Sequence, residues 1–214
     1  MKVSLTDAGK RFNREWVFRH LTFTFEEAQS YAIVGPNGSG KSTLLQVLSG
    51  SMQLSEGKGE WSMVNARLNE SFGQGELPAE KVYSHVSICA PYVEVVEEMT
   101  LKEFLSFHQG FKPFLPGFTV EKIISVLDLK HAADKQIRFY SSGMKQRVKL
   151  AQAIFSDVPL VLLDEPCTNF DGAGIALYHQ LMKDHCKNRL LIVSSNDEVE
   201  YGFCGEKINI MTYK

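Results

Sequence analysis

The stretch YAIVGPNGSGKSTLL, residues 31–45, constrains this chain more than any other. Its apolar run ends in GPNGSGKS, residues 35–42, which match the pattern GxxxxGK[ST] between a predicted strand and a predicted helix. Glycines in such a loop let backbone N–H groups turn toward phosphate oxygens, and the N-terminus of the next helix adds its positive dipole. The predicted phosphate-binding residues are Gly35, Pro36, Asn37, Gly38, Ser39, Gly40, Lys41, Ser42 and Thr43.

Specific roles within this loop follow from the chemistry of the side chains. We expect Lys41 to reach the β- and γ-phosphates, Ser42 to ligate Mg²⁺ and Thr43 to support the α-phosphate. A magnesium site also needs a carboxylate at the end of an apolar strand, and LVLLDE supplies Asp164. Glu165 follows directly, where a carboxylate could polarise a water for attack on the γ-phosphate. ATP and Mg²⁺ are therefore the predicted ligands.

Hydrophobic periodicity predicts strands and helices that alternate at both ends of the chain, with a helical stretch in the middle. The predicted strands cover residues 3–7, 21–25, 30–35, 59–64, 83–90, 160–164, 190–195 and, at a sheet edge, 208–213. The predicted helices cover residues 41–48, 100–108, 120–129, 141–155 and 173–187, and a loop or hairpin is expected around GQGELP, residues 73–78. The fold class is therefore α/β with a mainly parallel sheet.

Four stretches together resemble the nucleotide-binding domain of the ATP-binding cassette (ABC) family, in order and in spacing. They are GPNGSGKST (35–43), YSSGMKQR (140–147), LVLLDEPCTNFD (160–171) and VSSND (193–197). The resemblance covers essentially the whole chain. It implies a phosphate-loop (RecA-like) core, an N-terminal antiparallel β subdomain and an inserted helical subdomain. The core would comprise residues 1–90 and 156–214, and the helical subdomain residues 91–155.

The same resemblance implies a site shared between two cassettes that face head to tail around two ATP molecules. The segment YSSGMKQR would contact the γ-phosphate of the opposite cassette through Ser141 and Gly143, with Ser142 between them in the same site. Asp171 of TNFD would lie near the opposite phosphate loop. Phe12 has the family's spacing for the aromatic residue that stacks on adenine. The segment itself departs from LSGGQxQR at Tyr140, Ser142 and Met144.

Two further positions depart from the family pattern. A glutamine is usual after the strand predicted at 83–90, and the sequence ICAPYVEVV places Pro91 or Tyr92 there. The switch histidine after the last core strand falls on Asn196, which we assign to the catalytic site as a weaker, uncharged donor. ATP binding is expected to survive both changes, while hydrolysis is expected to be slow but real.

Composition narrows the function classes. The net charge of −2 gives no electrostatic footprint for nucleic acid, and the four scattered cysteines lack metal-ligand spacing. No signal-peptide pattern or apolar run of ~20 residues is present. Together with these observations, the resemblance to the ABC family implies a cytoplasmic ATPase subunit, peripheral at the membrane through separate transmembrane subunits, that pairs with an identical or related cassette. The alternatives are a weakly hydrolysing regulatory cassette, a non-transport ABC ATPase and a small-molecule kinase. The position of the phosphate loop, which begins only at residue 35 after predicted strands, disfavours the kinase.

Overall fold

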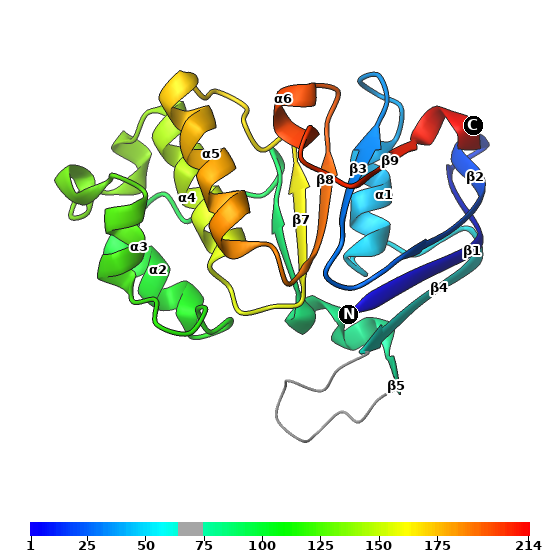
Figure 1. The fold of residues 1–214 in the computed structure, drawn as a ribbon, viewed down its shortest axis with the longest axis horizontal. Coiled ribbons are helices and arrows are strands. Elements are labelled where there is room, and N and C mark those ends of the chain that lie inside the picture. The colour runs from blue at the N-terminus through cyan, green and yellow to red at the C-terminus, as the bar shows by residue number, and fades with distance from the viewer. Residues whose placement is uncertain (64–74) are drawn as a thin grey trace.

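Two β-sheets and a group of helices form the computed structural model, which describes residues 1–63 and 75–214. A five-stranded parallel sheet lies at the centre, with the antiparallel strands on one side and most helices on the other (Figure 1). Its strand order is β6-β7-β8-β3-β9. The bounds are β3 (Ser30–Val34), β6 (Val86–Cys89), β7 (Leu160–Asp164), β8 (Leu190–Ser194) and β9 (Glu206–Asn209).

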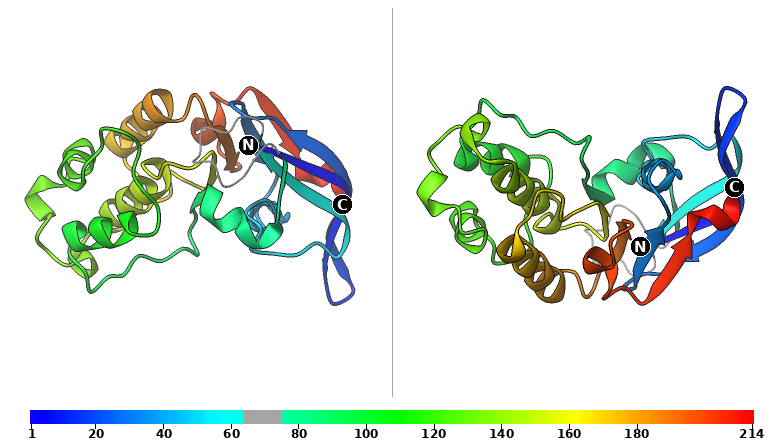
Figure 2. Two further views of the ribbon diagram at one scale, coloured as in Figure 1. Left: turned by 90° about the horizontal axis from the view of Figure 1, so that it is seen from below. Right: turned by 90° about the horizontal axis from the view of Figure 1, so that it is seen from above.

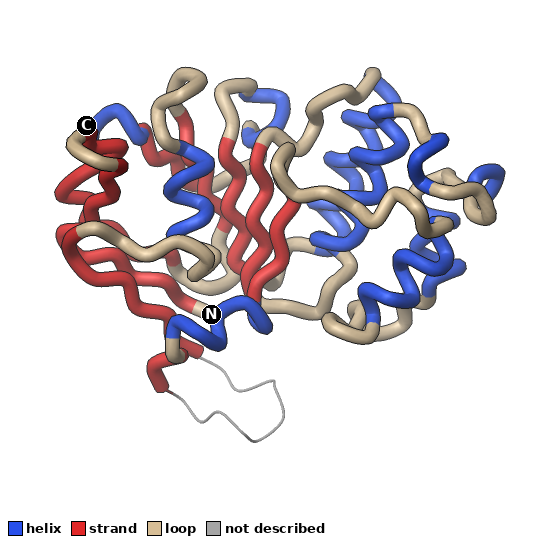
Figure 3. The backbone as a smooth tube through the Cα atoms, turned by 180° about the vertical axis from the view of Figure 1, so that it is seen from behind, coloured by secondary structure: helices blue, strands red, loops and turns tan. Residues whose placement is uncertain are grey.

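The second sheet is antiparallel and has the order β2-β1-β4-β5. Its strands are β1 (Lys2–Phe12), β2 (Glu15–Phe25), β4 (Glu56–Met63) and β5 (Gly75–Leu77). Helix α1 (Lys41–Leu48) lies between the two sheets, as the view from behind shows (Figure 3). Leu44, Leu45 and Leu48 of this helix are fully buried in the core that the two sheets share. The antiparallel sheet thus covers the helix that begins at the phosphate loop.

Four α-helices gather at the opposite end of the molecule (Figure 2), namely α2 (Leu101–Gln109), α3 (Val120–Val126), α4 (Ser142–Ile154) and α5 (Gly172–His185). The short α6 (Glu198–Tyr201) follows β8. The described part of the chain also contains the 3₁₀ helices η1 (Ala79–His85), η2 (Lys130–Ala132), η3 (Ile137–Phe139) and η4 (Ile210–Tyr213). No helix among the described residues is long and apolar enough to cross a bilayer.

Alternating side chains of the central strands belong to two different cores. Leu160 and Leu162 of β7 pack toward α1 and the antiparallel sheet, whereas Val161 and Leu163 pack toward the helices α2 to α5. Because helices or strands cover both faces of the sheet, all five residues of β7 and all five of β8 are buried. This explains the uninterrupted apolar runs of the sequence, which end at Asp164 and Ser194, the last residues of β7 and β8.

The predicted fold class is confirmed, and most predicted elements have somewhat different bounds. Strands β1 and β2 are each 11 residues long and extend beyond the predicted 3–7 and 21–25. Three further elements differ for a local reason. Residues 83–90 contain the end of η1 and then β6, because η1 begins directly after Pro78 and runs to His85. The helix predicted at 120–129 ends at Val126, since Asp128 adopts a positive φ of 58° and turns the chain away.

The predicted edge strand at 208–213 is also shifted. Strand β9 does occupy the edge of the sheet but ends at Asn209, whose side chain accepts a hydrogen bond from Met211 N and starts a 3₁₀ turn. Val64, at the end of the strand predicted over 59–64, lies outside the described residues, as do Gly73 and Gln74 of the predicted loop. Gly75–Leu77 of that loop form a strand that pairs with β4, so the hairpin alternative fits this part.

Candidate nucleotide-binding site

The loop between β3 and α1 needs glycine at two positions, because each has a positive φ and a close neighbour. Gly35 has a φ of +154°, and a Cβ there would meet Ile210 Cγ2 at 2.7 Å. Gly40 has a φ of +102°, and a Cβ there would lie 2.3 Å from Val17 Cγ1 of β2. The loop therefore passes directly beneath β2, at a separation that a side chain on residue 40 would prevent.

Lys41 bends back over this loop. Its Nζ donates hydrogen bonds to the carbonyl oxygens of Gly35 at 2.8 Å and of Pro36 at 3.2 Å. The residue is buried, and within the described part of the chain its ammonium forms no ion pair with a carboxylate. Gly40 is the N-cap of α1 and provides no side-chain cap, so the first amide groups of the helix are free. The Lys41 ammonium and these amide groups therefore lie at the same place. This arrangement favours an anion.

A pocket of about 270 Å³ opens at this place. It is lined by Val17, Asn37, Gly38, Gly40, Lys41, Ser42, Thr43 and Glu165. The structure therefore brings the predicted phosphate loop together with the acidic residue that follows β7, although the two are separated by more than a hundred residues in the sequence. Val17 is the apolar wall of the pocket and comes from the antiparallel sheet.

Asp164 ends β7 in a buried position, with 2% of its surface exposed. Its Oδ1 atom is buried and has no hydrogen-bond partner in the described structure. A buried carboxylate oxygen without a donor is costly in a protein interior unless a cation or a water bound to one compensates it. The residues present therefore fit a hydrated Mg²⁺, which proteins hold through one or two carboxylates together with hydroxyl and phosphate oxygens.

Glu165 has an unusual backbone conformation for a residue that is not glycine, with a φ of +46°. Its N–H donates to Ser194 O at 2.9 Å, and its carbonyl accepts from Thr168 Oγ1 at 2.8 Å. The side chain is half-buried and lines the pocket that contains Lys41. A carboxylate thus lines the same pocket as the Lys41 side chain.

Two positions that depart from the family pattern also reach this region. Burial, followed by the negative charge of Asp164, raises the pKa of the Tyr92 hydroxyl to about 12, and Gln46 of α1 lies close enough to this hydroxyl to oppose the rise. Of the two predicted candidates, Tyr92 is thus the one near the site, whereas Pro91 offers its carbonyl to Lys149. Asn196 Nδ2 donates to Asn37 Oδ1 at 3.3 Å, so this side chain contacts the phosphate loop.

Other predicted residues lie outside the pocket. Phe12, at the end of β1, is 49% exposed and has Lys10 Nζ 5.2 Å from its ring centroid. Ser141 caps α4 by accepting from Met144 N at 3.2 Å, and Ser142 beside it is exposed. Gly143 approaches Asn169 O closely, since a Cβ there would lie 3.1 Å from it.

Asp171 likewise acts as a helix cap, because its Oδ1 accepts from Gly174 N at 2.8 Å at the start of α5. Within one chain, therefore, neither the segment YSSGMKQR nor Asp171 completes the pocket.

Sequence reasoning missed Val17 and Gln46. The pattern EWVFRHLTF marks Val17 only as a residue on the less buried face of a strand, and nothing local shows that the phosphate loop passes beneath it. Gln46 lies one helical turn beyond Ser42, on a helix whose buried residues are Lys41, three leucines and a valine. Its helical spacing from Ser42 is the only signal that could have pointed to it.

The parallel sheet carries this loop after β3 and a buried aspartate at the end of β7, with β8 between the two strands. This arrangement defines a phosphate-loop nucleotide-binding protein. The chain belongs to the ABC transporter family, whose family model matches residues 18–168. This confirms the family predicted from the four motifs.

Three known proteins illustrate the similarity. An uncharacterized ABC transporter ATP-binding protein of Bacillus subtilis is 29% identical over 217 residues, which cover 98% of this chain and 66% of that protein. A cytochrome c biogenesis ATP-binding export protein of Brucella abortus is 30% identical over 189 residues, covering 88% of this chain and 81% of the relative. The structure of a dimeric bacterial ABC transporter cassette superposes with a TM-score of 0.78 at 20% identity, covering 97% of this chain and 94% of that one. The chain thus spans about two thirds of the length of the first relative.

Proposed function

We propose that this chain binds ATP with Mg²⁺ in the pocket at the phosphate loop and hydrolyses it, as the ATP-binding subunit of a transporter. The observation that carries the proposal is the juxtaposition of Lys41 and Glu165 in one pocket, beside the start of α1. The names of the relatives, which describe transporter ATP-binding and export proteins, support it.

Binding would rest on groups that the loop already presents. Lys41 would exchange its contacts with the Gly35 and Pro36 carbonyls for the β- and γ-phosphates. Ser42 and Asp164 would hold Mg²⁺, and the unpartnered Oδ1 of Asp164 supports this assignment. When bound, the metal would neutralise charge that develops on the phosphates. The amide groups of Gly38 and of residues 40–43 would hold the remaining phosphate oxygens, whereas Ser39 N already donates to Pro36 O.

Glu165 would act as the general base. Its carboxylate lines the pocket but makes no hydrogen bond to Lys41, so it is free to accept a proton from an attacking water. Asn196, which already contacts Asn37, would donate its amide toward the γ-phosphate. An amide carries no charge, so this donor would stabilise the transition state less than a protonated histidine.

A second cassette would complete the site. Ser141, Ser142, Gly143 and Asp171 lie outside the pocket of their own chain, and helix α4 begins at Ser141, so its N-terminus could receive the γ-phosphate of a partner. The dimeric state of the similar solved cassette supports this pairing. We assign residues 91–155 to a helical subdomain that presents this segment, and residues 1–90 and 156–214 to the core. Phe12 would stack on adenine beside Val17.

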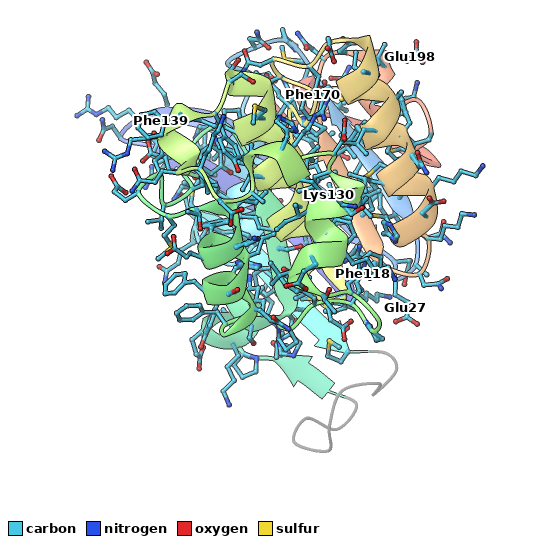
Figure 4. All side chains as sticks on the ribbon, turned by 90° about the vertical axis from the view of Figure 1, so that its left-hand side faces the viewer. Glu27, Phe118, Lys130, Phe139, Phe170 and Glu198 are labelled. Carbon is cyan, nitrogen blue, oxygen red and sulfur yellow. The ribbon has the colours of Figure 1, made fainter. Side chains whose placement is uncertain are left out.

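Separate transmembrane subunits would bind the helical end of the molecule and would hold the chain at the cytoplasmic face of the membrane. Large apolar side chains are exposed there, including Phe107 of α2 and Phe111 just beyond this helix, which contact each other with ring centroids 4.9 Å apart. Phe139 of η3 is 73% exposed and projects from the surface of the same end (Figure 4). Exposed aromatic residues of this kind mark interaction surfaces.

A regulatory cassette that hydrolyses ATP slowly is the second candidate function. Tyr92 and Asn196 favour it, because each replaces a residue that the family resemblance ties to hydrolysis. The retained Glu165 favours the ATPase. A measurable turnover of Mg-ATP by the assembled complex would decide for the ATPase.

The test of the proposal is the variant Glu165→Gln. It should bind Mg-ATP like the wild type and lose most of its turnover, since the amide cannot accept a proton. ATP-bound chains should then persist as dimers in sedimentation velocity, because hydrolysis no longer opens the interface. A variant that hydrolyses ATP at the wild-type rate would exclude Glu165 as the base.

A further inference from the structure

The turn that carries Glu165 has a backbone that local preferences oppose. Glu165 has a φ of +46°, which is uncommon for a residue with a side chain. The next residue is Pro166, which favours an extended conformation in the residue before it. A conformation of this kind persists only where the surrounding structure holds it in place. The contacts that hold this turn are therefore informative.

The peptide group between Pro166 and Cys167 is held from two sides. Gln146 Nε2 donates to Pro166 O at 2.8 Å, and Cys167 N donates to Glu200 Oε1 at 2.7 Å. Both polar atoms of a single peptide group are thus bound by side chains, and each of those side chains is only 6% exposed. We call this pair of residues, Gln146 and Glu200, the peptide clamp.

The clamp joins the turn to two different elements. Gln146 lies on α4, five residues after its cap Ser141, and Glu200 lies on α6, four residues after Asn196. Helix α6 is itself fixed, because the buried Tyr178 hydroxyl donates to Glu200 O at 2.7 Å. The turn thus contacts both the segment proposed to meet the partner cassette and the segment that carries Asn196.

Glu200 is also a costly residue for mere packing. Its Oε2 atom is buried without a hydrogen-bond partner in the described structure, and burial raises the pKa of its carboxyl. A buried carboxyl with one unsatisfied oxygen destabilises a fold relative to an apolar side chain of similar size. The Ser195 hydroxyl and Cys167 N both lie beside this carboxyl and oppose the rise in its pKa. The hydrogen bond from Cys167 N, at 2.7 Å, is the contact that joins Glu200 to the turn.

We propose that Gln146 and Glu200 are positioning residues for Glu165: they fix the Pro166–Cys167 peptide so that the carboxylate before it faces the pocket. This inference rests on the proposed role of Glu165 as the base. Because the clamp residues contact neither the phosphate loop nor the pocket, their removal should change catalysis and leave nucleotide binding intact.

The experiment compares kcat and KM for Mg-ATP in the variants Glu200→Met and Glu200→Gln. Methionine has a similar length but accepts no strong hydrogen bond, and we expect kcat to fall about 10- to 100-fold with KM changed less than about twofold. Glutamine keeps an oxygen that can accept from Cys167 N, so its kcat should stay within about threefold of the wild type. Equal kcat values for Glu200→Met and the wild type would overturn the clamp.

Tyr178→Phe is the matched control. It removes a buried hydrogen bond to the main chain of the same residue on α6 but leaves the clamp side chains in place. It should lower the melting temperature without lowering kcat. A loss of kcat equal to that of Glu200→Met would mean that the clamp residues act only through the stability of the fold and do not position Glu165. Gln146→Met tests the same peptide group from α4, with the same expected loss, and decides the question if Glu200→Met does not fold.

Glu165→Gln, measured in parallel, separates this inference from the proposed function. If Glu165→Gln is inactive and Glu200→Met is fully active, the clamp is wrong and the base assignment stands. If Glu165→Gln is fully active, the base assignment itself is wrong.

Discussion

The close approach of β2 to the phosphate loop makes Gly40→Ala a sensitive perturbation. A Cβ at residue 40 would lie 2.3 Å from Val17 Cγ1, and the backbone there has a φ of +102°. Carbon atoms in contact are normally about 3.5–4.0 Å apart, so β2 or the loop would have to move by about 1.2 Å or more. The substitution therefore disturbs both Val17 and the phosphate loop, which line the pocket together.

The expected cost has two parts. Overpacking of this kind costs about 1–3 kcal/mol, and the unfavourable φ adds roughly 1–3 kcal/mol. For a chain of 214 residues, each kcal/mol lowers the melting temperature by about 2–4 °C, so a decrease of at least ~4 °C is expected. Thermal unfolding followed by circular dichroism measures it directly.

Gly38→Ala is the control, because Gly38 also has a positive φ, +74°, but a Cβ there would meet nothing within 4 Å. It should cost only the conformational part. The double variant Gly40→Ala with Val17→Ala should recover part of the loss, since it removes the atom that clashes. Equal losses at residues 38 and 40, or a double variant whose losses simply add, would refute the contact.

Four further predictions concern three side chains. Asn196→Ala should change the free energy of unfolding by less than about 1 kcal/mol, because its contact to Asn37 is long and exposed, yet turnover should fall; an unchanged rate would make Asn196 a bystander. In the wild type, ATPase activity should vary little between about pH 6 and 8, and Asn196→His should introduce a pH dependence there. Burial raises the pKa of the Glu200 carboxyl above its ordinary value of 4.5, so ionisation of this carboxyl destabilises the folded state as the pH rises. Glu200→Gln should therefore raise the melting temperature more at pH 8 than at pH 5. A larger gain at pH 5 would contradict this effect of burial. Phe12→Ala should leave stability nearly unchanged and weaken ATP binding, since stacking on a base contributes about 1–3 kcal/mol; an unchanged Kd would return Phe12 to a surface role.

The sequence predicts those parts of the fold that depend on neighbours along the chain. Residues 160–163 are apolar without interruption because both faces of β7 are covered, and the apolar run stops at Asp164, the last residue of this strand. The phosphate loop is likewise local, since its glycines and Lys41 form one continuous turn.

Contacts between distant segments could not be predicted in this way. The pairing of Val17 with Gly40 depends on how the antiparallel sheet lies over the loop. The clamp joins Cys167 to a residue 33 positions away and Pro166 to one 20 positions away. Asp128 ends α3 through a positive φ that the apolar spacing of 120–129 does not reveal. In each case tertiary packing decides what the local pattern leaves open.

The most direct test of the nucleotide site is the effect of Mg-ATP on thermal unfolding of the wild type and of Lys41→Ala. A ligand at 100 times its Kd stabilises a fold by about 2.7 kcal/mol, which should raise the melting temperature of the wild type by several degrees. Lys58→Ala, at an exposed position of the antiparallel sheet, should keep the whole shift. Lys41→Ala should lose it, because the cation that the loop holds toward the phosphates is gone. An equal shift in Lys41→Ala and the wild type would contradict the assignment of this pocket to ATP.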